Sequence, residues 1–239
     1  MPHEKSARCF FSHSRYIEKL VEKHKVPTGR VPKSATTAST DHNAECTSAP
    51  DGNGKDPPYR GLVGELMWCG GLRADVQNSM RDLSQYLASP TVAARKAADR
   101  TLRYLSRTKQ FGVGTSDRIQ RDFETKLKGI LTHQKPGKYG GLVRAPTEQT
   151  SKADLVAFSD SSYADQKNSR STSGLVCYYH GMPVMARSRL QKLTATSTAE
   201  AELCAASEAA REIQFLRKLA SFVTGTVSYT HLRAHETDS

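Results

Sequence analysis

The 239-residue chain lacks the patterns that mark several large classes of protein. It has no run of about 18 apolar residues, the length a membrane-spanning helix needs, and no apolar targeting core near its start. Its five cysteines are widely spaced and form no CxxC pair, which favours neither a zinc site nor a disulfide framework. It also has no glycine-rich phosphate loop and no Ser-His-Asp order. We therefore expect an intracellular protein with reduced thiols and no membrane partner.

Apolar residues are scarce and positive charge is abundant. The apolar fraction is 37% and the mean hydropathy is −0.59, so a packed core is expected in only part of the chain. Lys and Arg number 35 against 24 Asp and Glu, a net charge of +11. Residues 91–150 carry thirteen Lys/Arg and five Asp/Glu, or 13 − 5 = +8. A solvated, loop-rich surface and a surface for a polyanion both explain this excess.

The first quarter of the chain divides into a short helix and a linker. Residues 1–27 are predicted to contain an amphipathic helix at 14–25, which Pro27 ends. Residues 28–57 are rich in Thr, Ser, Asp, Asn, Gly and Pro and have almost no large apolar residue. We expect them to form a disordered linker.

Residues 58–111 are predicted to be helical. The apolar spacing from Val76 to Leu87 follows i, i+4, i+7, i+11, and Pro90 ends that helix and starts another. The second helix, at 90–108, has small apolar residues on one side. Its other side carries basic residues, namely Arg95, Lys96, Arg100, Arg103 and Arg107. Residues 112–152 are basic and contain glycine, so we expect a linker without long regular structure.

The sequence pattern of residues 153–220 predicts an α/β layer. The apolar run at 155–158 predicts a central strand buried on both faces, and strands are expected at 174–179 and 184–190. Ser197 and Glu200 fit a capping box, with Ser197 as N-cap and Glu200 reaching back, followed by apolar residues at helical spacing. The predicted fold class is therefore mixed α/β, with three strands followed by a helix.

Several short stretches resemble the copia-type (Pseudoviridae-like) LTR retrotransposon Pol polyproteins, in the region that follows the reverse-transcriptase palm. These stretches are FSHSRYI at 11–17, PYRGLVG at 58–64, LSQY at 83–86, AADRTLRYL at 97–105, FSDSSYA at 158–164, RSTSG at 170–174 and STAEAE at 197–202. Each is short, but their order and distances are specific. The resemblance implies a helical, thumb-like connection followed by a ribonuclease H-like fold.

The resemblance also implies a metal site. In ribonuclease H the first strand ends with a metal-binding Asp, which matches Asp160. The first helix supplies a Glu followed by an apolar residue and then small ones, which matches Glu202 better than Glu200. Two Mg²⁺ ions about 4 Å apart would then promote hydrolysis of the RNA strand of RNA–DNA hybrids. Without the resemblance, we would interpret Asp160 as a turn residue at a strand end and Glu202 as a solvated carboxylate on a helix.

The chain departs from this family pattern in several places. It has Arg73, Ala74 and Asp75 where the family commonly has Arg-Pro-Asp. A third Asp on a fourth strand, a late acidic or His position and the paired aspartates of the palm have no match. The helix is expected to end near Ala220, and within the tail 221–239, residues 227–239 resemble the conceptual translation of a sequencing-library adapter. Without the fourth strand, the strand at 155–159 becomes an exposed edge. We therefore expect an incomplete, inactive domain and marginal stability for residues 154–220 alone.

Two functions of different classes follow. One is a ribonuclease of RNA–DNA hybrids, partnered by the remainder of the polyprotein, with the palm, in a cytoplasmic virus-like particle or the nucleus. The other is a non-catalytic nucleic-acid-binding segment, in which the basic residues of helix 90–108 and Arg170 contact phosphates. A decayed element without a selected function is a third explanation.

Overall fold

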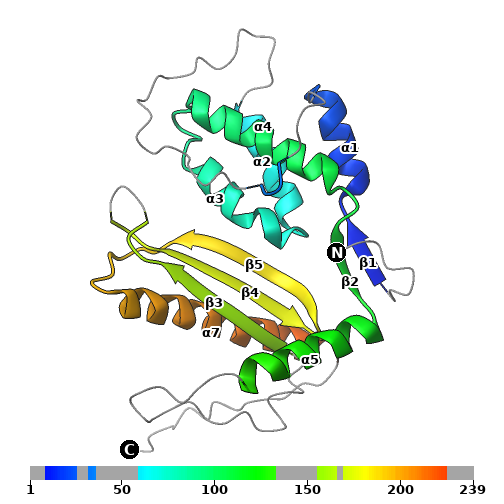
Figure 1. The fold of residues 1–239 in the computed structure, drawn as a ribbon, viewed down its shortest axis with the longest axis vertical. Coiled ribbons are helices and arrows are strands. Elements are labelled where there is room, and N and C mark those ends of the chain that lie inside the picture. Colours follow the sequence, from blue (N-terminus) through cyan, green and yellow to red (C-terminus); the bar gives the residue numbers. More distant parts are fainter. Residues whose placement is uncertain (1–8, 26–31, 36–58, 133–154, 166–168, 225–239) are drawn as a thin grey trace, which may run out of the picture.

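A computed structural model describes residues 9–25, 32–35, 59–132, 155–165 and 169–224. The described chain is a mixed α/β protein with two small sheets (Figure 1). None of the helices in these ranges combines the length and apolar character needed to cross a membrane. The expectations for most of the 28–57 linker, for 133–152 and for the 227–239 tail fall outside the described residues.

The first part, here called the helical unit, is an α-helical cluster with its own core. It consists of α1 (Ser14–Lys23), α2 (Tyr59–Gly70), the 3₁₀ helix η1 (Ala74–Val76), α3 (Gln77–Ser84) and α4 (Val92–Arg107). Its fully buried side chains include Ile17, Leu62, Leu66, Leu102 and Leu105. These positions recur at helical spacing, as the sequence predicts. The Thr91 side chain caps α4 by accepting a hydrogen bond from the Ala94 amide at 3.1 Å.

A buried arginine joins η1 to the end of α4. Arg73 is 3% exposed; its guanidinium donates to both carboxylate oxygens of Asp75 at 2.9 and 2.7 Å, and to the Thr108 carbonyl at 2.8 Å. Tyr104 donates its hydroxyl to Asp75 at 2.6 Å, and its ring and that of Phe111 lie within 5.6 Å of the guanidinium. Burial alone would raise the pKa of Asp75, but the hydrogen bonds from Arg73 and Tyr104 outweigh it and hold that pKa below its usual value.

Residues 112–132 form regular structure, so the expectation of a linker without long regular structure is wrong there. Strand β2 (Gly112–Thr115) pairs antiparallel with β1 (Cys9–Ser12), and α5 (Asp117–Thr132) follows. The sequence places Gly112 at the start of the predicted linker. In the structure a Cβ at this position would overlap the Phe11 carbonyl oxygen, so glycine is what lets β1 approach. The Ser116 hydroxyl accepts from the Ile119 amide at 3.2 Å and starts α5.

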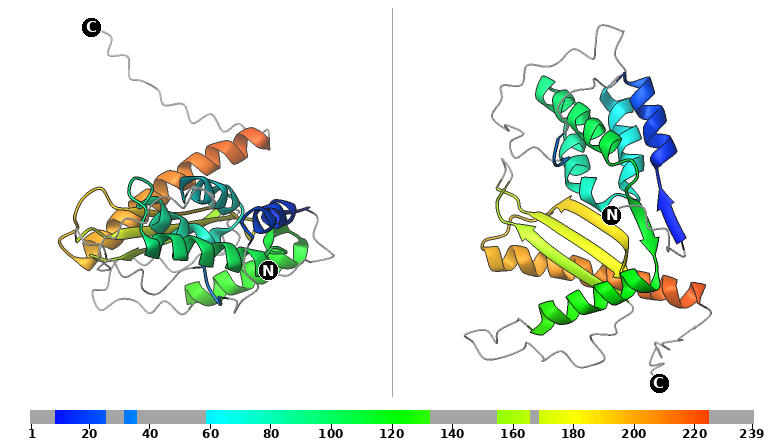
Figure 2. Two further views of the ribbon diagram at one scale, coloured as in Figure 1. Left: turned by 90° about the horizontal axis from the view of Figure 1, so that it is seen from above. Right: turned by 45° about the vertical axis from the view of Figure 1, so that its right-hand side comes forward.

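The second part, here called the sheet unit, holds three antiparallel strands in the order β3-β4-β5. These are β3 (Leu155–Ser162), β4 (Thr172–Tyr179) and β5 (Met182–Leu190). The long helix α7 (Thr198–Val223) covers one face, where Leu175, Cys177, Ala209 and Leu216 form a second core (Figure 2). On the other face α5 covers one end, with Phe123 stacked on Tyr178 at 5.0 Å between ring centroids. Three strands followed by a helix is the predicted order.

Two details of this unit differ from expectation. Strand β3 is an edge of the described sheet, as expected without a fourth strand, but Phe158 is 36% exposed, so burial on both faces is wrong for this strand. An apolar run alone does not tell a central strand from a half-covered edge. Helix α7 runs to Val223 rather than ending near Ala220, because no glycine or proline interrupts it.

Gly181 is expected to be the least replaceable glycine of the sheet unit. It has φ +77°, and a Cβ there would lie 2.9 Å from the Phe123 Cβ. Gly181→Ala should therefore lower the free energy of unfolding by about 1–3 kcal/mol in chemical denaturation. Gly129→Ala in α5 is the matched control: its Cβ would meet nothing within 4 Å, and helix propensity should make it neutral or stabilising. Equal losses for the two variants would contradict this assignment.

Removing the Arg73 side chain should destabilise the helical unit strongly. Arg73→Ala leaves Asp75 without its buried cationic partner and removes the guanidinium donor from the Thr108 carbonyl, which keeps only the Phe111 amide. We expect a loss of about 3 kcal/mol in urea denaturation. The control is Arg60→Ala, because Arg60 is exposed and donates one hydrogen bond, to the Leu87 carbonyl; its loss should stay below about 1 kcal/mol. Similar losses would show that the Arg73 network adds nothing special.

Candidate functional site

The site predicted from the resemblance lies at the end of β3. Side chains alternate along a strand, and Leu155 and Ala157 pack into the core under α7. Asp160 therefore belongs, with Phe158 and Ser162, to the opposite face of the sheet. We call this the Asp160 face; across the strands Asp160 is paired with Gly174, and Gly174 with Ser188. The Asp160 side chain is exposed there.

Glu202 comes to the same strand end from α7. Its Oε1 accepts a hydrogen bond from the Ser161 backbone amide at 3.3 Å. Since β3 is an edge strand among the described residues, this amide needs an acceptor from outside the sheet. The Glu202 carboxylate is thus held beside β3, at the residue that follows Asp160 in the chain.

The start of α7 explains why Glu202, and not Glu200, reaches β3. Ser197 is the N-cap, and its hydroxyl accepts from the Glu200 amide at 3.2 Å. The Glu200 carboxylate turns back to Thr196, where it accepts from the amide and the hydroxyl, both at 2.7 Å. These bonds lower the pKa of Glu200. Glu200 therefore reaches the residue before the N-cap rather than the N-cap itself.

The two carboxylates meet the strand end from opposite faces. The described residues contain no group of three or more His, Cys, Asp or Glu side chains placed to hold a metal ion. Asp165, the next carboxylate along the chain, accepts from the Thr172 hydroxyl at 2.9 Å. Magnesium sites need several oxygens converging on one point. The pair as placed does not fit two Mg²⁺ ions, and the roles of Asp160 and Glu202 as ligands stay a prediction.

Asp160 lines a hollow that no motif in the sequence predicts. Its volume is about 390 Å³, and it lies between the Asp160 face and the helices η1 and α3. Ala74, Gln77 and Asn78 line it from the helical unit. The Asn78 Oδ1 accepts a hydrogen bond from the Ser188 hydroxyl at 3.1 Å. These two residues are 110 positions apart and carry no motif, so sequence reasoning could not pair them.

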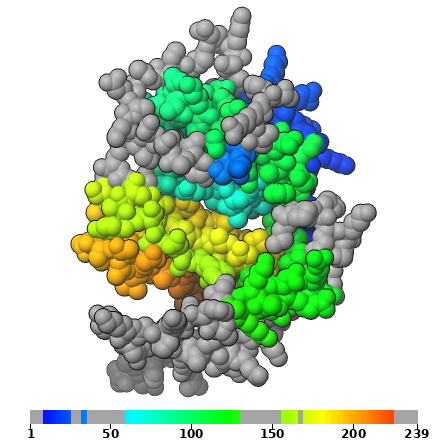
Figure 3. Space-filling view, viewed as in Figure 1, coloured from blue at the N-terminus to red at the C-terminus, as the bar shows by residue number. Residues whose placement is uncertain are grey.

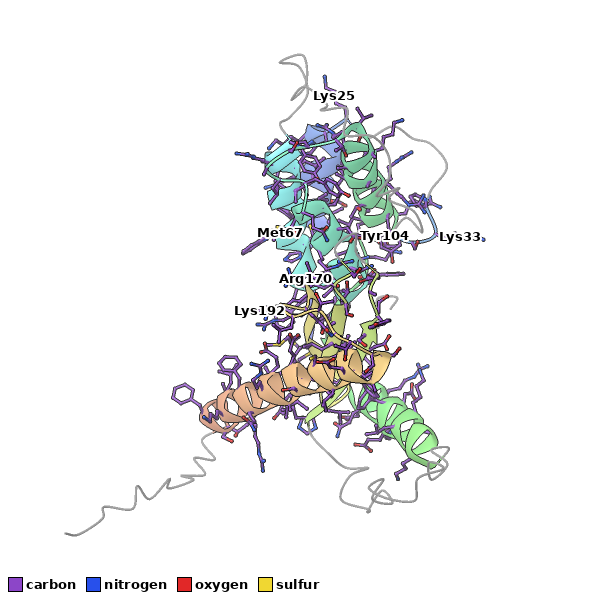
Figure 4. All side chains as sticks on the ribbon, turned by 90° about the vertical axis from the view of Figure 1, so that its left-hand side faces the viewer. Lys25, Lys33, Met67, Tyr104, Arg170 and Lys192 are labelled. Carbon is purple, nitrogen blue, oxygen red and sulfur yellow. The ribbon has the colours of Figure 1, made fainter. Side chains whose placement is uncertain are left out.

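The predicted phosphate-contacting residues are only partly gathered. Lys96, Arg100, Arg103 and Arg107 follow i, i+4, i+7, i+11 along α4 and form one stripe opposite its buried side. Lys96 and Arg107 are exposed, whereas the other two are half-buried. Arg95 lies beside the stripe, with its Nε 3.4 Å from Asp99. Arg170 is separate, near the junction between the helical unit and the sheet (Figure 4).

Comparison with protein families and solved structures gives no match: no family model and no solved structure matches this chain. Curated sequences do match. The "Retrovirus-related Pol polyprotein from transposon RE1" of Arabidopsis thaliana is 27% identical over 162 residues, which are 67% of this chain and 9% of that protein. The "Retrovirus-related Pol polyprotein from transposon TNT 1-94" of Nicotiana tabacum is 26% identical over 221 residues, 89% of this chain and 14% of that protein.

A shorter relative is matched over nearly its whole length. The "Secreted RxLR effector protein 161" of Plasmopara viticola is 30% identical over 164 residues, which are 68% of this chain and 93% of that protein. The polyproteins are far longer, and this chain spans only 9% and 14% of the two described above. Their similarity agrees with the motifs that carry the resemblance. Over the matched residues the chain is similar to copia-type retrotransposon Pol polyproteins.

Proposed function

We propose that this chain is a part of a Pol polyprotein related to ribonuclease H, and that it does not cut the RNA strand of an RNA–DNA hybrid by itself. The observation that supports the relationship is the hydrogen bond from the Ser161 amide to Glu202, which brings the helix carboxylate beside the Asp160 strand end. It agrees with the order in which the resemblance places an Asp on the first strand and a Glu on the first helix. In this proposal the partners are the hybrid and the reverse-transcriptase palm of the same polyprotein.

Inactivity of the chain alone follows from the number and direction of its carboxylates. The Asp160 side chain is exposed on the face of the sheet opposite α7, and Glu202 is engaged by a backbone amide. Two anionic groups that do not converge bind a dehydrated divalent ion weakly, because the lost hydration is not replaced. The Mg²⁺ chemistry of the family would thus require acidic residues beyond this pair.

Hybrid cleavage tests the ribonuclease proposal. The chain alone should leave the labelled RNA strand intact in Mg²⁺, whereas a fusion to the segment that follows the matched region in the RE1 polyprotein should cleave it. Asp160→Asn should reduce the fusion to background. Asp165→Asn is the matched control at the same strand end, and it should keep most activity because Asp165 bonds to Thr172. A fusion that cuts nothing, or equal loss for both variants, would end the ribonuclease assignment.

A second function, binding of nucleic acid without catalysis, is supported by the stripe on α4. The four cations occupy one side of a helix whose other side is packed in the core, so the stripe is held rigidly at the surface. A rigid row of cations gains affinity for a polyanion by releasing its counterions. This contact would not depend on base sequence.

The salt dependence of binding tests the stripe. The double variant Lys96→Gln/Arg107→Gln should lower the slope of log affinity against log salt by about 1.5–2, measured with an RNA–DNA hybrid by fluorescence anisotropy. The matched control is Arg217→Gln/Lys218→Gln, an equal charge change at exposed positions of α7, which should leave the slope unchanged. If both pairs change the slope equally, net charge and not the α4 stripe governs binding.

A further inference from the structure

Helix α7 covers only part of its face of the sheet. It packs against β3 and β4, with its buried side chains on the second core. A helix is about 10–12 Å across and neighbouring strands lie about 4.8 Å apart, so one helix covers about two strands. This leaves room beside α7 over the third strand, β5. The opposite face of the sheet, seen in Figure 3, lies between the helical unit and α5.

A hollow of about 630 Å³ occupies this room, and we call it the α7 groove. Leu175 of β4 lines it from the core, and residues 189–193, at the end of β5 and just after it, form one wall. The other wall is α7, which contributes Leu203, Cys204, Ser207, Glu208, Arg211 and Glu212. These recur every fourth residue in neighbouring pairs, so they form one side of the helix. The volume is in the range of ligand sites in proteins.

Gln191 fixes the wall opposite α7. Its side-chain amide donates to the Ser173 hydroxyl and to the Ala201 carbonyl, both at 2.9 Å. The end of β5 is therefore tied to β4 and to the first turns of α7. Lys192 and Leu193 follow directly and are exposed. Figure 4 shows Lys192 on the same side of the strands as the C-terminal half of α7. The groove is thus formed by the fold itself and needs no ligand to shape it.

Apolar side chains are exposed where the groove meets solvent. Leu193 and Leu203, one from each wall, are 76% and 71% exposed. Three further exposed apolar side chains continue along α7, namely Phe215, Leu219 and Phe222. Counted from Arg211 they follow i+4, i+8 and i+11, so they share its side of the helix. Exposed apolar residues gathered in this way mark a surface that binds a partner.

The charge of the groove favours an acidic partner. Its three cations come from both walls and are Arg189, Lys192 and Arg211. Of its two carboxylates, Glu208 and Glu212, the second forms an ion pair with Arg187 of β5. Three cations therefore face one remaining carboxylate, a balance of 3 − 1 = +2. Carboxylates of a partner would complement this charge and raise the rate of association.

We infer that the α7 groove binds an acidic, amphipathic helical segment of a partner protein. Apolar side chains of the segment pack against Leu193 and Leu203, and its carboxylates meet the three cations. This is the helix-in-groove mode of recognition, in which anchors recur at i, i+3, i+4 and i+7. The inference goes beyond the proposed function, since neither the α4 stripe nor Asp160 takes part in it.

Two other occupants fit the groove less well. A nucleic acid would bring its phosphates against exposed leucines and against Glu208, which repels them. A second copy of this chain carries the same net charge of +11, so its approach is opposed by like charge. An acidic segment meets neither obstacle.

A synthetic peptide tests the inference on the full chain. The probe is a fluorescein-labelled helical peptide of about 20 residues, with leucines on one face and glutamates on the other. One control peptide has lysine for each glutamate, and another has the same composition with leucines spread around the helix. Fluorescence anisotropy measures affinity. Mass spectrometry measures maleimide labelling of two native thiols, Cys204 in the groove and Cys9 in β1.

The Leu/Glu peptide should bind at least about tenfold more tightly than either control peptide and should slow labelling of Cys204 but not of Cys9. Arg211→Glu should weaken binding about fivefold or more, and Leu203→Asp about tenfold or more. Arg217→Glu is the matched control, because it makes the same charge change at an exposed position of α7 outside the groove. It should bind like the parent.

Equal weakening by Arg211→Glu and Arg217→Glu would overturn the inference, because net charge alone would then explain binding. Unchanged labelling of Cys204 would overturn it as well, since the peptide would lie elsewhere. Displacement of the peptide by an RNA–DNA hybrid, with hybrid binding lost in Arg211→Glu, would assign the groove to nucleic acid instead. A dimer in sedimentation that Leu203→Asp dissolves would assign it to a second copy.

Discussion

A backbone amide at the edge of a sheet needs an acceptor, and at the end of β3 the amide of Ser161 finds one in Glu202. That bond fixes the first turns of α7 against the strand that carries Asp160. At the same helix end the Glu200 carboxylate accepts hydrogen bonds from Thr196 instead. The two glutamates of the first turns of α7 therefore bind different partners. A carboxylate that binds an edge amide is held in place but loses part of its capacity for a cation. The same contact thus anchors α7 to the edge strand and limits the chemistry of the site.

Because side chains alternate along β3, its residues face two different parts of the molecule. Odd positions such as Ala157 complete the core under α7, and Asp160 turns toward η1 and α3. The helical unit needs no part of that core, because it buries its own apolar residues and locks η1 to α4 through Arg73. Two units that are each satisfied internally can meet through polar groups.

The sequence was informative where periodicity and capping act locally. The apolar spacing from Val76 to Leu87 predicted a helix, and Ser197 with Glu200 predicted the start of another. It failed where a residue serves a partner distant in the chain. Gly112 suggested a loop, although it is the residue that allows β1 to pair with β2. Asn78 and Ser188 have no local signature at all, so the contact between the units was invisible before the structure.

The placement of charge separates the proposed binding surface of this chain from its proposed carboxylate site. The cations of α4 lie on the helical unit, whereas Asp160 and Glu202 lie at the end of β3 in the sheet unit. A polyanion is attracted to the first surface and repelled by the second unless cations neutralise the carboxylates. Attraction needs only exposed charge on a stable helix, and it survives any change at the strand end. Cleavage needs several oxygens aligned within a fraction of an ångström. Loss of one acidic partner therefore removes hydrolysis long before it removes affinity, and a member of this family can keep the second property without the first.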